Sequence, residues 1–75
     1  MDDREAIDLL EVALVAAESM EEDVGIARHV FNGGEWLLAL MELESVARSN
    51  AEYNKKWSSG LQSIRVALGN PPDPW

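Results

Sequence analysis

The sequence predicts a small all-α protein, a four-helix bundle with three long helices and one short helix. Three observations carry this prediction. Apolar residues recur every three or four positions through most of the chain, which is the spacing of the buried face of a helix. Few segments alternate with the period of two that a half-buried strand shows. Gly and Pro residues fall between the periodic segments, and the short joints that they mark favour antiparallel neighbouring helices.

The first helix is expected from about Asp3 to about Met20. Asp2 should cap it, with Glu5 three residues later as the reciprocal partner of a capping box. One face is apolar at helical spacing, and we expect it to be buried; it consists of Ala6, Leu10, Ala13, Leu14 and Ala17. Another face is acidic and includes one valine, with the residues Asp8, Glu11, Val15, Glu18 and Glu22.

The second helix is expected to be short. It can begin in the acidic run 21–23, because negative charge suits the positive end of a helix dipole. It should end at Asn32-Gly33-Gly34, since glycine readily adopts the left-handed backbone of a helix end. His29, the only histidine in the chain, falls within it and is interpreted as an ordinary surface or boundary residue.

The third helix is expected from Glu35 to about Arg48. The apolar residues on its predicted core face are Trp36, Leu40, Leu43 and Ala47, widened by Ala39 and Val46. Leu38 and Met41 fall on the opposite face together with Glu42. A single core stripe does not require two large apolar side chains on that side.

The fourth helix is expected from about Ala51 to Leu68, with Ser49 and Glu52 as a second capping box. It carries the clearest apolar stripe in the chain, formed by Tyr53, Trp57, Leu61, Ile64 and Leu68. Gly69 should end it. The predicted bundle therefore occupies residues 1–69, and residues 70–75 form an irregular Pro-rich tail. Trp75 in that tail is expected either to pack back on the bundle or to anchor a partner.

Composition limits the possible functions. A chain of 75 residues is expected to form one domain, and at this size roughly 62% of the unfolded surface is buried, which allows one modest core. The absence of cysteine excludes disulfides and thiolate sites and favours a reducing, cytoplasmic location. The net charge of −8 disfavours direct binding to nucleic acid or to anionic membranes. The same charge keeps a small protein soluble, and it can also attract a basic protein partner.

The sequence offers no recognisable catalytic, cofactor or metal site, and we expect a protein that is not an enzyme. A single histidine and no cysteine leave no set of metal ligands of the usual kinds. Glu42 and Glu44 are two residues apart, so they point to different sides of a helix. The glycines before the third helix are typical of a phosphate site at a helix start, but Glu35 would repel phosphate.

The segment 32–43, Asn-Gly-Gly-Glu-Trp-Leu-Leu-Ala-Leu-Met-Glu-Leu, is the most distinctive part of the chain. It resembles the Gly-Glu-aromatic/apolar-x-x-Ala-Leu-x-x-Leu segment of the MafI-like immunity proteins, small helical partners of bacterial polymorphic and contact-dependent toxins. The matching positions are Gly34, Glu35, Ala39, Leu40 and Leu43. The expected order of the helices is also similar. The chain departs from that pattern in the less apolar run 44–47 and in the Pro-rich tail.

The resemblance implies that the chain binds a cognate toxin, commonly a nuclease, and neutralises it by blocking the active site or the substrate path. We expect the toxin to be basic. The candidate partner-binding residues are Glu35, Leu38, Met41 and Glu42 on the third helix, and Asp8, Glu11 and Glu18 on the first. The alternative is a small helical adaptor or regulatory protein that acts through homodimerisation or partner binding. The sequence leaves the oligomeric state open.

Overall fold

A computed structural model describes residues 1–70, which form four α-helices and no strand. The helices are α1 (Asp3–Ser19), α2 (Gly25–Asn32), α3 (Trp36–Ser49) and α4 (Ala51–Ala67). The predicted all-α bundle of three long helices and one short helix is therefore confirmed. The expectations of an irregular conformation beyond Asn70 and of a position for Trp75 concern residues outside this described part.

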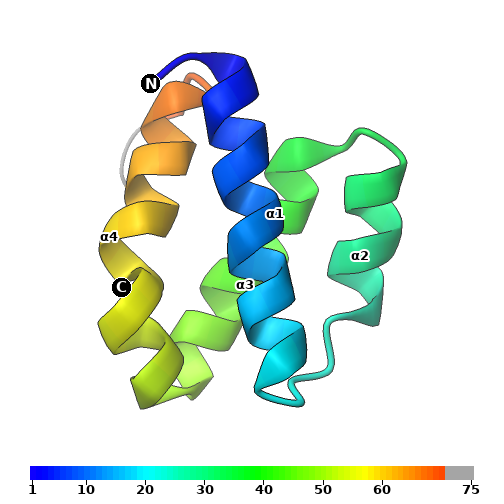
Figure 1. The fold of residues 1–75 in the computed structure, drawn as a ribbon, viewed down its shortest axis with the longest axis vertical. Coiled ribbons are helices and arrows are strands. Elements are labelled where there is room, and N and C mark those ends of the chain that lie inside the picture. The colour runs from blue at the N-terminus through cyan, green and yellow to red at the C-terminus, as the bar shows by residue number, and fades with distance from the viewer. Residues whose placement is uncertain (71–75) are drawn as a thin grey trace.

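The helices run alternately in opposite directions (Figure 1). In the view of Figure 1, α1 lies in front of α3, while α4 and α2 flank this pair on either side. Both α1 and α3 contact all the other helices, whereas α2 and α4, over the described residues, do not contact each other. Two central helices thus hold the bundle together, and each keeps one side away from the core.

The core forms from the apolar faces that the periodicity predicts. All five predicted residues of α1 are completely buried, as are Leu40 and Leu43 of α3 and Leu61 and Ile64 of α4. Tyr53 is buried as well, and its hydroxyl donates a hydrogen bond of 2.8 Å to the carbonyl oxygen of Ala13. Burial raises the pKa of this phenol, so Tyr53 remains a neutral donor that links α4 to α1.

The two described tryptophans lie at the edge of the core rather than in its centre. Trp36 and Trp57 are each partly buried and pack against the core residues. Trp36 meets Phe31 edge to face, with ring centroids 5.1 Å apart. Trp57 stacks near Tyr53 and also covers Gly60, where an added Cβ would lie 3.4 Å from the Trp57 ring. A Cβ at Gly60 would therefore be in ordinary van der Waals contact with this ring.

The start of α1 agrees with the prediction, but the start of α4 does not. At α1 the Glu5 amide donates to Asp2 Oδ1 at 2.8 Å and the Asp2 amide donates to Glu5 Oε1 at 3.5 Å. The predicted capping box of Ser49 and Glu52 is wrong, because Ser49 is still the last residue of α3. Asn50 caps α4 instead, and its Oδ1 accepts a hydrogen bond of 3.1 Å from the Tyr53 amide.

The acidic run 21–23 does not begin the second helix, so that prediction is also wrong. These residues complete the end of α1: the Glu21 amide donates to the Glu18 carbonyl, and the Glu22 amide donates to the Ala17 carbonyl. Glu21 takes a left-handed backbone with φ 62° to make this turn. The second helix, α2, therefore begins only at Gly25. No helix of residues 1–70 is long and apolar enough to cross a membrane.

Candidate partner-binding surface

The outer side of α3 carries the two exposed apolar residues that the sequence singled out. Leu38 is 46% exposed and Met41 is 48% exposed. They are three residues apart on the helix and therefore neighbours on its surface. Glu42 is exposed beside them, and Glu35 is exposed directly before the first turn. The structure thus brings all four candidate residues of this helix to one surface, which we call the α3 face.

The position of the α3 face follows from how the other side of the helix is used. The buried side of α3 is formed by Ala39, Leu40, Leu43, Glu44, Val46 and Ala47, and Trp36 and Leu37 are partly buried beside it. Leu38 and Met41 are consequently directed to solvent by helix periodicity. Met is unbranched and adaptable in shape, which suits a surface that packs against another molecule.

The candidate residues of α1 are arranged differently. Asp8, Glu11 and Glu18 are all exposed, but two of them pair with Arg28 of α2. The Arg28 guanidinium donates to Glu18 at 2.7 and 3.0 Å, and it lies 3.8 Å from Glu11. This hydrogen bonding lowers the pKa of Glu18 and raises the pKa of Arg28. Glu11 and Glu18 therefore tie α2 to α1, and Asp8 is the remaining candidate.

Two exposed valines lie near Asp8 on the outer side of α1. Val12 is 54% exposed and Val15 is 47% exposed. They form a pair at the same spacing as Leu38 and Met41, and we call them, together with Asp8, the α1 face. The α1 face is smaller in apolar volume than the α3 face because its two side chains are shorter.

The ion pair between Glu44 and Arg65 was not predicted from the sequence. Glu44 is only 1% exposed, and its carboxylate accepts hydrogen bonds of 2.7 and 2.5 Å from Arg65, which is 14% exposed. The pair joins α3 to α4. A signal was present in the sequence, since Glu44 lies four residues after Leu40 and three before Ala47, both predicted core positions. A carboxylate on that side requires a positively charged partner.

Residues 1–70 contain no group of three His, Asp or Glu side chains that is suited to hold a metal ion. Every buried side-chain nitrogen or oxygen in this part of the chain has a hydrogen-bond partner. His29 is exposed on α2.

Comparisons with models of protein families, with curated proteins and with solved structures give no match to this chain.

Proposed function

We propose that this domain acts by binding another protein, and that the partner is a basic bacterial toxin domain that it neutralises by covering the active site or the substrate path. One observation carries the proposal: Leu38 and Met41 stay about half exposed between Glu35 and Glu42, on a helix whose buried side is already filled. Exposed apolar groups with a polar border are characteristic of protein interfaces. The resemblance of the segment 32–43 to MafI-like immunity proteins supports a toxin as the partner.

The size of the domain is compatible with this role. Its accessible surface is 4483 Å², and a standard interface takes about 800 Å² from each partner. One helix face with its borders can supply that area. In such an interface Leu38 and Met41 would form the apolar centre, and Glu35 and Glu42 would form part of the charged rim.

Charge supports a basic partner over a second copy of the same chain. At a net charge of −8, two copies repel each other, whereas a basic protein is attracted from a distance. The homodimeric adaptor remains the second candidate, because the same apolar pair would serve a self-interface. Measuring the oligomeric state of the isolated domain separates the two, since the immunity role requires no dimer.

The binding experiment uses the purified domain and, immobilised on a biosensor, the basic toxin domain that we expect a neighbouring gene to encode. Rim charges act mainly on association, so raising the salt concentration should slow binding. The apolar centre acts mainly on dissociation. The double variant Leu38→Asp/Met41→Asp should therefore dissociate at least tenfold faster, which corresponds to about 1.4 kcal/mol or more.

The matched control is Val12→Asp/Val15→Asp, which adds the same two charges to an equally exposed apolar pair on α1. It should leave the dissociation rate close to that of the wild type. If the control variant loses binding and the α3 variant keeps it, the α1 face is the contact surface. If the wild type binds no toxin and sediments as a dimer, the adaptor replaces the immunity role.

A further inference from the structure

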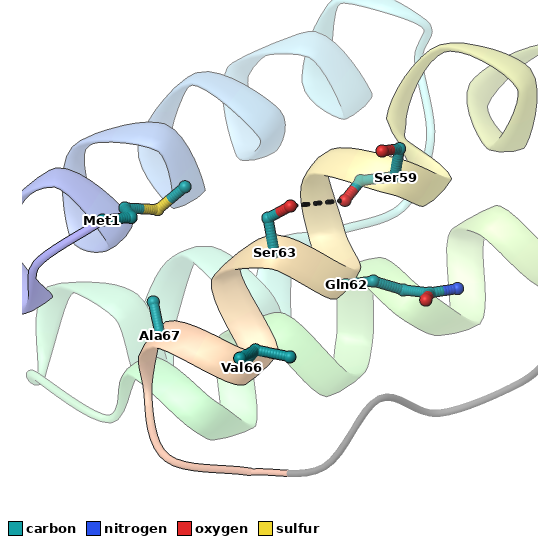
Figure 2. A pocket seen from close by; sticks show the side chains of 6 residues that line it. All are labelled: Met1, Ser59, Gln62, Ser63, Val66 and Ala67. Carbon is teal, nitrogen blue, oxygen red and sulfur yellow. Dashed lines mark hydrogen bonds between the residues drawn. The ribbon is translucent and has the colours of Figure 1, made fainter.

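Methionine supplies all the sulfur of this chain, because the sequence has three methionines and no cysteine. Met20 is the C-terminal cap of α1, is partly buried and packs against the core. Met1 is 58% exposed and lines a pocket together with Ser63 and Ala67 of α4 (Figure 2). Met41 is 48% exposed and lies on the α3 face. Two of the three thioethers are therefore open to a reagent in solution, and one of these two belongs to the proposed contact surface.

The surroundings of Met41 give its sulfur a central place on the α3 face. Leu38 is its apolar neighbour one turn earlier, and Ser45 is exposed one turn later. Glu42 is exposed beside it. Of the α3 residues, all of which the structure describes, only Leu38 and Met41 are large, apolar and exposed. One of the two side chains that form the apolar centre of the proposed interface is therefore a thioether.

A thioether reacts with hydrogen peroxide without the help of a catalytic group. The sulfur lone pair attacks one peroxide oxygen, so that a sulfur–oxygen bond forms and the oxygen–oxygen bond breaks. The second oxygen leaves as hydroxide and takes the proton of the transferred oxygen, which yields water. The sulfur loses two electrons and the peroxide gains them. The product, methionine sulfoxide, is polar and chiral, and reductases specific for each of its two epimers return the thioether, so the change is reversible.

A sulfoxide oxygen does not suit the apolar centre of an interface. It is a hydrogen-bond acceptor, and burying an acceptor without a donor costs free energy that burying a thioether does not. The two carboxylates of the α3 face, Glu35 and Glu42, offer no donor when they are ionised. In the free domain the same oxygen stays in water, because Met41 lies on the exposed side of α3. Oxidation therefore weakens the bound state and leaves the fold in place.

We propose that Met41 is a site of reversible oxidation by peroxides, and that its sulfoxide releases the partner from the α3 face. The inference rests on the proposed function, because it acts on the apolar centre of the same surface. Met1 undergoes the same reaction beside α4, where it leaves the α3 face unchanged. Bound partner in turn protects Met41, because it buries the thioether. The domain thus holds its partner under reducing conditions and releases it when peroxide accumulates.

The test treats the purified chain with hydrogen peroxide, removes the peroxide, and then measures binding to the toxin domain on the biosensor. Peptide mass spectrometry gives the sulfoxide fraction at each methionine, and Met41 should be oxidised faster than Met20. The oxidised wild type should dissociate about tenfold faster than the untreated protein. Methionine sulfoxide reductases should restore the slow dissociation. Met41→Leu keeps an apolar side chain of similar volume, so it should bind well and stay insensitive to peroxide. Met20→Leu is the matched control and should remain sensitive.

The outcomes separate the role of Met41 from the function on which it rests. Untreated wild type that does not bind the toxin domain contradicts the proposed function, and the role of Met41 is overturned with it. If untreated wild type binds and the oxidised wild type dissociates at the same rate, only the role of Met41 is overturned. The same follows if Met41→Leu loses binding on oxidation as the wild type does, or if far-UV circular dichroism shows that oxidation unfolds the helices.

Discussion

Three of the four helices end in the same pattern of hydrogen bonds, and in only two of them does glycine occupy the left-handed position. At the ends of α2 and α4 this position is held by Gly34 (φ +82°) and Gly69 (φ +86°). At the end of α1 it is held by Glu21, with φ 62°. A side chain in this conformation costs about 1–2 kcal/mol because its Cβ approaches the following carbonyl oxygen. Glu21 is thus a strained residue in an otherwise regular backbone.

We predict that Glu21→Gly stabilises the domain. Relief of the left-handed strain should exceed the entropy that glycine adds to the unfolded chain, which leaves a gain of about 0.5–1 kcal/mol. Urea unfolding followed by circular dichroism measures the free energy of unfolding. The reverse control is Gly69→Ala, whose added Cβ meets no atom within 4 Å, so its expected loss arises from the backbone alone. A loss of stability in Glu21→Gly would contradict this explanation.

The buried pair of Glu44 and Arg65 allows a second prediction at this scale. Arg65→Leu leaves the Glu44 carboxylate buried without this partner and should cost about 3 kcal/mol, most of the stability of a domain this small. The double variant Glu44→Leu/Arg65→Leu removes both charges and should be more stable than Arg65→Leu. Urea unfolding of the wild type, both single variants and the double variant forms a complete cycle. A loss in the double variant equal to the sum of the two single losses would mean that the two groups are not coupled.

At the scale of the helix, the turn between α3 and α4 depends on one side chain. Asn50 ends α3 and caps α4, with an extended backbone of φ −125° and ψ 104°. Its amide group also donates to Glu22 at 3.3 Å, which connects this turn to the end of α1. The Ser49 hydroxyl instead donates to the Val46 carbonyl within its own helix.

We therefore predict that Asn50→Ala lowers the free energy of unfolding by about 1 kcal/mol, the usual cost of losing a helix cap. Ser49→Ala should change it by less than about 0.5 kcal/mol, as expected for a surface substitution. Thermal or urea unfolding of the two variants, one residue apart, decides between the two caps. A larger loss of stability in Ser49→Ala than in Asn50→Ala would contradict this assignment and support the capping box predicted from the sequence.

Helix α2 depends on packing more than the other helices do. It has eight residues and no side-chain hydrogen bond at its start, whereas an isolated helix needs about 12–15 residues to be even marginally stable in water. Arg28 forms ion pairs with Glu18 and Glu11 and thereby links α2 to α1. Two of the three carboxylates predicted on α1 as partner contacts thus have a role within the fold.

Glu18→Gln should increase hydrogen exchange of the α2 amides at neutral pH, with little effect on those of α4. Because Arg28 lowers the pKa of Glu18, the stabilisation that this carboxylate provides is present above its ordinary pKa of 4.5. It is lost as the pH falls through the lower value of the folded state. The difference between wild type and Glu18→Gln should therefore shrink at pH values below 4.5. A difference that persists at low pH would show that the pair does not hold α2 in place.

The sequence predicted the positions of the helices well and their ends less well, for physical reasons. Buried faces such as that of α1 follow from periodicity, because each residue turns the helix by a fixed angle. The cap at Asn50 was missed because Ser and Asn both cap helices, and only the path of the chain selects one of them. Arg65 could not be assigned to Glu44 because the two are 21 residues apart, and their meeting depends on how α3 and α4 pack.

At the scale of the whole molecule, the bundle is flat, with extents of 28 × 26 × 15 Å. Seen down the shortest axis, α1 lies in front and α3 behind (Figure 1). The outer sides of these two helices therefore face opposite broad surfaces of the bundle. A partner that contacts about 800 Å² of the domain covers one of these surfaces but not both. The α3 face and the α1 face are thus alternatives, and a pair of matched variants can distinguish them.

We propose that the α3 face neutralises a toxin, and growth of bacteria that co-express the toxin that we expect a neighbouring gene to encode tests this most directly. Wild type and Val12→Asp/Val15→Asp should restore growth, whereas Leu38→Asp/Met41→Asp, present at equal levels and folded by circular dichroism, should restore much less. Full protection by the Leu38→Asp/Met41→Asp variant would contradict the assignment of the α3 face. A wild type that fails to protect against the toxin would contradict the immunity function itself.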